Sequence, residues 1–169
     1  MCAVTSSTSK RVLLYRFDRE PFPAIVNPST YLLENGLELL TAAGTVQNLR
    51  YEEVKALCFV SEGITTADLF KDNIFFERRP KIPGLWTRFN FRDGSRLDGI
   101  LPHNLLEWPA SGYLITPPKA GPARQRVLIP RVALWATELR GVVGKSDASL
   151  RLPADSKRSP SGQLNMFDR

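Results

Sequence analysis

The sequence has 169 residues, of which 43% are hydrophobic and 24% charged, with a formal net charge of +6. This length suits one domain or two very small ones. No stretch approaches the roughly 18 apolar residues of a membrane span, residues 1–9 lack the basic flank and apolar run of a signal peptide, and two cysteines, Cys2 and Cys58, make neither a disulfide framework nor a metal-ligand spacing. We therefore expect a cytoplasmic protein with a packed core.

The N-terminal part is expected to form a polar, disordered leader at residues 1–9 and a β-rich unit at residues 10–61. Residues 11–17 (RVLLYRF) alternate with a period of two and run through the turn-like DREP into residues 22–26 (FPAIV), which predicts a hairpin. Further strands are expected at residues 37–40, 45–51 and 54–60, bounded by Gly36, Gly44 and Glu52-Glu53. Cys58, in the last of these, reads as a small buried hydrophobe.

A connector is predicted at residues 62–84. Its apolar residues are spaced for a short helix that begins near Thr65 or Thr66 and ends before Pro80 and Pro83, and the apolar positions are Ile64, Leu69, Phe70, Ile74 and Phe75. This apolar content favours a packed connector over a free linker.

The second unit, residues 85–144, repeats the order of the first. Asp93-Gly94 is the strongest two-residue hairpin signal in the chain, and strands are expected at residues 85–91, 96–101, 112–116, 126–130 and 132–139. Phe17 corresponds to Phe91, Phe22 to Leu97, GLELLT to GYLIT, and Ala24-Ile25-Val26 to Gly99-Ile100-Leu101. We infer a mainly β protein of two tandem, small five-stranded β-barrels from an internal duplication with a period near 75 residues, because closure would remove exposed strand edges.

The second unit resembles the Sm-like and SH3-like small barrels, with Asp93-Gly94, Gly99 and Arg140-Gly141 as the matching residues. Residues 85–144 also resemble an uncharacterised bacterial domain family with the pattern FxDGxxLxGxL…GFLLTPP…RVxVPxxAL. The first unit departs from this pattern, since Arg19-Glu20-Pro21 replaces the Asp-Gly turn and Ala24 the glycine of the bend. Only fragments of the Asp, Asn and Arg-Gly set that implies RNA binding in Sm proteins are present.

The excess positive charge is C-terminal, because residues 76–169 hold 16 Lys/Arg against 8 Asp/Glu, whereas residues 1–75 hold 7 against 9. If the basic residues fold onto one face, they could contact phosphates, and an exposed tryptophan could stack on bases. The candidate nucleic-acid contacts are Arg88, Arg92, Arg96, Arg124, Arg126 and Trp108, with Trp108 expected to be exposed. The alternatives are a basic surface without a nucleic-acid role, and tryptophans that belong to the core.

Catalytic patterns are sparse, so we predict no enzyme activity, no metal and no cofactor. His103, the only histidine, reads as a solvated loop residue, and Asp93 is explained by the preference of aspartate for turns. Cys2 would need further residues to act as an N-terminal nucleophile. The GVVGK segment at residues 141–145 lacks the spacing of a phosphate-binding loop and reads as a strand end.

Residues 145–169 are rich in Ser, Pro, Lys and Asp, which predicts a flexible, disordered tail. Within it, QLNMFD resembles the bacterial sliding-clamp-binding motif, whose common form is Gln-Leu-Ser/Asp-Leu-Phe. Gln163, Leu164, Met166 and Phe167 match in type and order, while Asn165 replaces Ser or Asp. The alternatives to clamp binding are docking of these side chains on the protein's own barrels and a chance match.

Taken together, the sequence predicts a non-enzymatic binding or adaptor protein whose tail recruits a protein partner, with the bacterial sliding clamp as the named candidate. The resemblance implies that Leu164, Met166 and Phe167 enter an apolar groove and that Gln163 sets the register by hydrogen bonding. The alternative is a nucleic-acid-binding protein that uses the basic second unit. No membrane partner is expected, and the sequence leaves the oligomeric state open.

Overall fold

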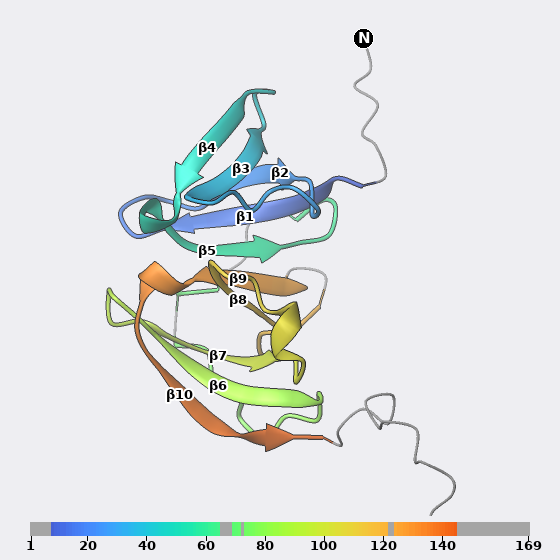
Figure 1. Ribbon diagram of the computed structural model, residues 1–169, viewed down its shortest axis with the longest axis vertical. Helices are drawn as coiled ribbons and strands as arrows, with labels where there is room; N and C mark the ends of the chain where they lie inside the picture. The colour runs from blue at the N-terminus through green and yellow to red at the C-terminus, as the bar shows by residue number, and fades with distance from the viewer. Residues whose placement is uncertain (1–7, 65–68, 72, 122–123, 145–169) are drawn as a thin grey trace, which may run out of the picture.

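The computed structural model describes residues 8–64, 69–71, 73–121 and 124–144 (Figure 1). The predicted tail at residues 145–169 and residues 1–7 of the predicted leader lie outside this part of the chain. The described residues are mainly β, as the sequence predicts, and their only helical pieces are three short 3-10 turns. They include no helix with the length and apolar character required to cross a bilayer.

Five strands and a 3-10 turn form the first unit. Their bounds are β1 Lys10–Arg16, β2 Phe22–Val26, β3 Gly36–Thr41, β4 Val46–Arg50, the 3-10 turn η1 Tyr51–Glu53, and β5 Val54–Phe59. All five lie where the alternating and apolar runs of the sequence predict strands, with small shifts at their ends. The alternation is visible in β1, where Val12 and Leu14 point into one hydrophobic cluster and Leu13 and Tyr15 into another.

The second unit repeats this order and adds one further 3-10 turn. Its elements are β6 Gly84–Phe91, β7 Arg96–Leu101, η2 Leu105–Glu107, β8 Gly112–Ile115, β9 Arg126–Pro130, η3 Arg131–Ala133, and β10 Leu134–Val143. The Asp93-Gly94 hairpin is confirmed, because Gly94 has a φ of 86° and its N–H donates to the Phe91 carbonyl at 3.0 Å. A positive φ is the conformation that glycine adopts without a steric cost.

The two units share one strand order, which supports the inferred duplication. In the first unit the order is β4-β3-β2-β1-β5. In the second, β10-β6-β7 and β8-β9 are joined by an Ile100–Thr116 bridge, which gives β9-β8-β7-β6-β10. Strand register corrects one predicted correspondence: Arg16, opposite Val54, occupies the place of Phe91, opposite Leu134, so Phe17 is one residue out of step.

The predicted closed barrels are wrong. The ladders form a seven-stranded sheet, β4-β3-β2-β1-β5-β9-β8, and a three-stranded sheet, β10-β6-β7. The physical reason lies at β5, whose second edge pairs with β9 of the second unit and so is not free to close on β4. An unpaired strand edge is covered here by the neighbouring unit instead of by closure.

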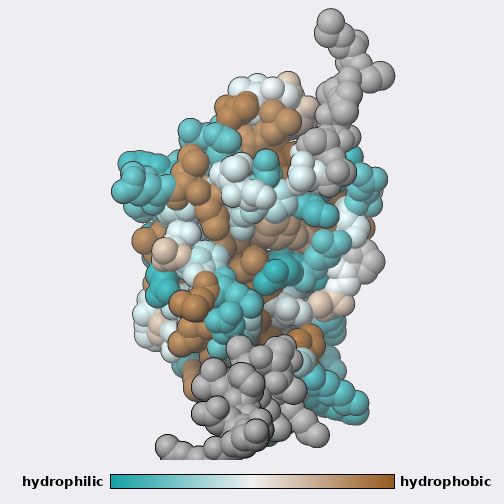
Figure 2. Space-filling view, turned by 45° about the vertical axis from the view of Figure 1, so that its right-hand side comes forward, coloured by the Kyte–Doolittle hydropathy of each residue, from teal (hydrophilic) through white to brown (hydrophobic). Residues whose placement is uncertain are grey.

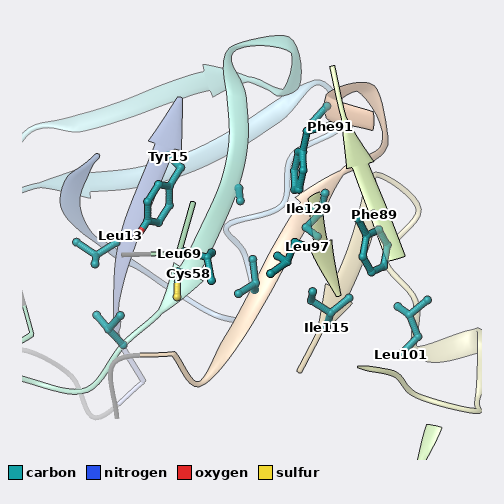
Figure 3. Packing of buried hydrophobic residues seen from close by; sticks show 14 residues of the cluster. Leu13, Tyr15, Cys58, Leu69, Phe89, Phe91, Leu97, Leu101, Ile115 and Ile129 are labelled. Atoms are coloured by element: carbon teal, nitrogen blue, oxygen red, sulfur yellow. The ribbon is translucent and has the colours of Figure 1, made fainter. Parts of the chain in front are cut away.

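The shared sheet has a cluster of buried residues on each of its two faces, and Figure 3 shows the cluster between the units. One cluster lies within the first unit and includes Val12, Leu14 and Leu57, together with Leu128 from β9. The other lies between the units, where Leu13 and Cys58 of the first unit meet buried residues of the second, including Phe89, Phe91, Leu97, Ile115 and Ile129. Because β1 and β5 present opposite faces to the two clusters, each unit completes the core of the other.

The connector is packed, as predicted, but its described residues form no helix. Ile74 makes a parallel bridge to Leu97, and its carbonyl accepts the Asp98 N–H at 2.9 Å, so this segment adds to the edge of β7. Leu69 is buried in the cluster between the units. The expected helix start near Thr65 or Thr66 lies outside the described residues. Pairing with the part of β7 beside Leu97 and Asp98 accounts for the extended backbone near Ile74.

Candidate interaction surface

Arg88, a predicted nucleic-acid contact, is bound within the protein. On the outer face of β6 its Nε donates to Asp98 Oδ1 at 2.7 Å and its Nη2 to Asp98 Oδ2 at 3.3 Å, while its guanidinium lies 4.0 Å from the Phe75 ring centroid. The hydrogen bond to Asp98 raises the pKa of Arg88. This guanidinium therefore balances a buried carboxylate, and a phosphate would have to compete with Asp98 for it.

Asp98 is fully buried and fixes the connector against the three-stranded sheet. Besides Arg88, its Oδ2 accepts the Trp86 Nε1–H at 3.1 Å and the Phe76 N–H at 3.2 Å. A buried carboxylate with several donors is the arrangement expected for a structural ion pair. Asp98 thus has a structural role that is separate from that of Asp93 in the hairpin turn.

Arg92 and Arg96 differ from Arg88 in their exposure. Arg92 is exposed, but its guanidinium lies 4.4 Å from the Phe17 ring centroid and its Nη2 donates to the Glu52 carbonyl at 3.0 Å, so it links the two units. Arg96 begins β7, where its backbone N–H donates to Asn73 Oδ1 at 2.9 Å, and the residue is exposed.

Arg124 and Arg126 lie near two different hollows. Arg124 lines one of about 440 Å³ together with Lys71, Lys119 and Glu77. Arg126 is exposed beside Phe59 and lines a second hollow, of about 340 Å³, whose wall also includes Tyr31. Burial raises the pKa of Tyr31 to about 12, so this phenol stays neutral at physiological pH.

Trp108 is not the exposed aromatic that the sequence predicts. It is half-buried, its Nε1 donates to the Pro102 carbonyl at 3.0 Å, and its ring packs edge-on against Tyr113 with the centroids 5.8 Å apart. The exposed tryptophan is Trp135 on β10, which is 70% exposed. The hydrogen bond to Pro102 holds the Trp108 ring against the protein. The sequence gives no indication that the Pro102 carbonyl, six residues earlier in a loop, would be the acceptor.

Sequence reasoning also missed a buried charge between the units. Lys55 on β5 is only 6% exposed, its Nζ lies 2.5 Å from Asp93 Oδ2, and the same Nζ lies 4.1 Å from the Phe70 ring centroid and 5.3 Å from that of Phe91. Burial of Asp93 opposes its ionisation, but hydrogen bonds from Lys55 and Ser95 outweigh this and hold the pKa of the carboxyl below its usual range. Asp93 is therefore a turn residue, as predicted, and an inter-unit ion pair as well.

The described exposed apolar residues include a group on and next to the last strand. Trp135, Leu139, Val142 and Val132 are all exposed, and β10 lies on the outer side of the three-stranded sheet in Figure 1. Within the described part of the chain, β10 pairs only with β6. On the face drawn in Figure 2, apolar side chains occur in several groups separated by hydrophilic ones.

His103 and Cys2 are the two residues on which an enzymatic alternative would rest. His103 is half-buried in the loop after β7, and its Nε2 has no hydrogen-bond partner. Cys58 is buried, and this burial raises the pKa of its thiol to about 12, which leaves it protonated as expected for a small core residue. The described residues contain no group of three His, Cys, Asp or Glu side chains placed to hold a metal ion, and Cys2 lies outside them.

Comparison with known families gave one match, to a family of unknown function (DUF6982), over residues 8–141. The chain belongs to this family. The matched range runs from just before β1 into β10, so it covers both units and the connector, more than the second unit alone for which the sequence showed a resemblance. Neither the curated proteins nor the solved structures gave a match.

Proposed function

We propose that this protein is a non-enzymatic binding adaptor that recruits the bacterial sliding clamp through Gln163, Leu164, Met166 and Phe167. The observation that carries the proposal is the motif itself, QLNMFD, in which three apolar side chains follow a polar segment. The second unit ends with its fifth strand, β10, at Val143, so the motif follows both repeats in the sequence. These four residues lie outside the described part of the chain.

The expected affinity follows from the size of the motif. Three apolar side chains bury a few hundred Å² in a groove, which at about 25 cal/mol per Å² gives several kcal/mol before the cost of ordering the peptide. The result is a dissociation constant in the micromolar range, on the order of 1 to 100 μM. Binding of this strength suits recruitment that is meant to be reversible.

The test is titration of the full chain into purified clamp by calorimetry. We expect micromolar binding by the wild-type chain, and at least a tenfold loss for Phe167→Ala because an anchoring ring is removed. Arg169→Ala is the matched control in the same segment and should bind as the wild type does. Absence of binding by the wild-type chain, or equal binding by Phe167→Ala, would overturn the proposal.

A second candidate function is nucleic-acid binding, and the basic hollow formed by Lys71, Lys119 and Arg124 favours it. We propose that the exposed Arg96, whose N–H donates to Asn73 in the wall of this hollow, extends the basic surface, and that Arg126 adds a cation beside the second hollow. Affinity for single-stranded RNA should then fall steeply as salt rises, since bound phosphates release counterions. Arg126→Glu should weaken binding, whereas Arg19→Glu, the same charge change on the first unit, should not. Equal effects of the two variants would show that binding depends on net charge alone and not on this surface.

We also propose that each unit is an open relative of the Sm-like and SH3-like barrels. Three features of the second unit support this: the Asp93-Gly94 turn, the buried Gly99, and Gly141 at a register shift of β10. A Cβ at Gly99 would meet the side chain of Ile115, so the absence of a side chain allows β7 to approach β8.

A further inference from the structure

The contact between the two units has a defined register. β5, the fifth strand of the first unit, pairs antiparallel with β9, the fourth strand of the second, through Leu57–Leu128, Cys58–Val127 and Phe59–Arg126. This pairing covers the second edge of β5 and places Leu128 in the cluster of the first unit. The molecule therefore already contains one inter-unit pairing, in which the fifth strand of one unit pairs with the fourth strand of the other.

Among the described strands, the repeat leaves the two halves of a second such pairing, β10 and β4, without partners at one edge. On β10, Thr137 opposite Phe89 occupies the place of Leu57 opposite Leu14, and Leu139 that of Phe59. On β4, Asn48 opposite Glu38 occupies the place of Leu128 opposite Leu114, and Val46 that of Arg126. Within the described residues, β10 and β4 are each at the edge of a sheet.

The backbone N–H and C=O groups that β4 needs for this pairing point toward its free edge. The Thr41 N–H donates to the Thr45 carbonyl at 2.9 Å, which fixes the alternation of the β3–β4 ladder. In an antiparallel ladder every second residue turns its N–H and C=O to the partner strand. Gln47 and Leu49 therefore face β3, and the N–H and C=O of Asn48 face the free edge.

The same reasoning applies to β10. The Phe91 N–H donates to the Ser95 carbonyl at 2.9 Å, so Phe89 also faces β7, and Arg88 and Asn90 face β10. Their partners on β10 are Glu138 and Ala136. The N–H and C=O of Thr137 and Leu139 consequently point away from β6, as those of Leu57 and Phe59 do on β5.

We propose that the chain associates head to tail with a second copy, with β10 of one molecule pairing antiparallel with β4 of the next. The register is Thr137–Asn48 and Leu139–Val46, which repeats Leu57–Leu128 and Phe59–Arg126. It brings together two exposed apolar side chains, since Leu139 and Val46 are each 64% exposed. Because the two edges differ, a copy that is bound through one edge can still bind another copy through the other, and the product is an open chain or a ring.

The test measures molar mass by light scattering of the full chain over a range of concentrations. Wild type should show a mass that rises with concentration beyond that of a dimer. Asn48→Pro, which removes only an N–H directed at the free edge, and Leu139→Lys should each weaken association at least tenfold. Leu106→Lys, the same class of change at an exposed leucine of η2, and Phe167→Ala in the tail should behave as wild type.

Mixing Asn48→Pro with Leu139→Lys tests whether β10 of one copy pairs with β4 of the other. Asn48→Pro keeps an intact β10 and Leu139→Lys keeps an intact β4, so an equimolar mixture should form a heterodimer with the affinity of the wild-type contact and grow no further. Val46→Lys replaces Asn48→Pro if the proline variant shows an altered unfolding midpoint. A monomeric wild type at every concentration, or self-association of the β4 variants at wild-type strength, overturns the proposal, and the latter result would indicate pairing of β10 with itself.

Discussion

The fifth strands of the two units, β5 and β10, occupy the same place in the repeat and have opposite surroundings. The contrast is clearest at the residue beside the first register shift, which is Lys55 in β5 and Trp135 in β10. Lys55 is 6% exposed and Trp135 is 70% exposed. The charged side chain is buried and the large aromatic one is at the surface, the reverse of what residue type alone predicts.

The difference lies in what covers the strand. β5 has β1 on one edge and β9 on the other, and a partner for its lysine in Asp93. β10 has β6 on one edge and no second partner among the described residues. In a repeat protein the burial of a strand depends on the next unit as well as on its own sequence.

The largest expected effect comes from truncating the covered strand. Leu57→Ala removes a fully buried side chain in the first cluster and should lower the free energy of unfolding by about 2 to 5 kcal/mol. Thr137→Ala at the equivalent position of β10 should change it by less than about 0.5 kcal/mol. Denaturant titration of both variants measures the pair, and equal losses would show that Thr137 is covered in solution.

Next in size is the ion pair that only the second unit has. Arg88 and Asp98 stand where the first unit places Leu13 and Pro23. Arg88→Met leaves a buried carboxylate without its cation and should lower the free energy of unfolding by about 2 to 3 kcal/mol, less than for a fully buried pair because Arg88 is partly exposed. Adding Asp98→Asn should recover at least half of that loss. If the double variant is no more stable than the single one, hydrogen bonding and not charge dominates at this site.

Two glycines should respond alike, because here the units are equivalent. A Cβ at Gly36 would meet the Leu49 carbonyl, and one at Gly112 would meet the Ile129 carbonyl, both at the start of the third strand. Gly36→Ala and Gly112→Ala should each lower the free energy of unfolding by about 1 to 3 kcal/mol. Gly141→Ala, where a Cβ would meet nothing within 4 Å, is the control. A loss in only one of the two variants would contradict their equivalence.

The smallest expected effect concerns pH. The pKa of Asp93 is lowered in the folded state, so its pairing with Lys55 stabilises the protein above the unfolded pKa of about 3.9 and is lost as pH falls through the folded pKa. Because Asp93 is partly exposed, the effect should stay below about 1 kcal/mol. The gap in unfolding free energy between wild type and Asp93→Ser should be constant above pH 5 and close as pH falls below 4, by about that amount. A gap that persists in acid would assign the effect to packing.

The strands and the Asp93-Gly94 turn could be predicted because their causes are local. Alternation sets the face of each side chain, and a glycine with positive φ marks the turn. The closure of the barrels could not be judged this way, since it depends on whether β9 or β4 occupies the second edge of β5. Nothing near Val54–Phe59 in the sequence records that choice.

The candidate contacts show the same limit. That Arg88 is basic is plain from the sequence, but its partner Asp98 lies across a ladder, and only the register brings the two together. Trp108 and Trp135 were equally available as exposed aromatics, and a carbonyl in the preceding loop decided between them. The tail motif and its partner stay predictions.

The cluster between the units also has a consequence during synthesis. The face formed by Leu13, Tyr15 and Cys58 emerges from the ribosome early, but β9, whose Val127 and Ile129 extend this face beside β5, follows about 70 residues after Cys58. At a synthesis rate of roughly 5 to 20 residues per second, β5 remains without β9 for about 4 to 14 seconds. A nascent chain paused within that interval exposes an apolar β surface that can bind chaperones or other nascent chains.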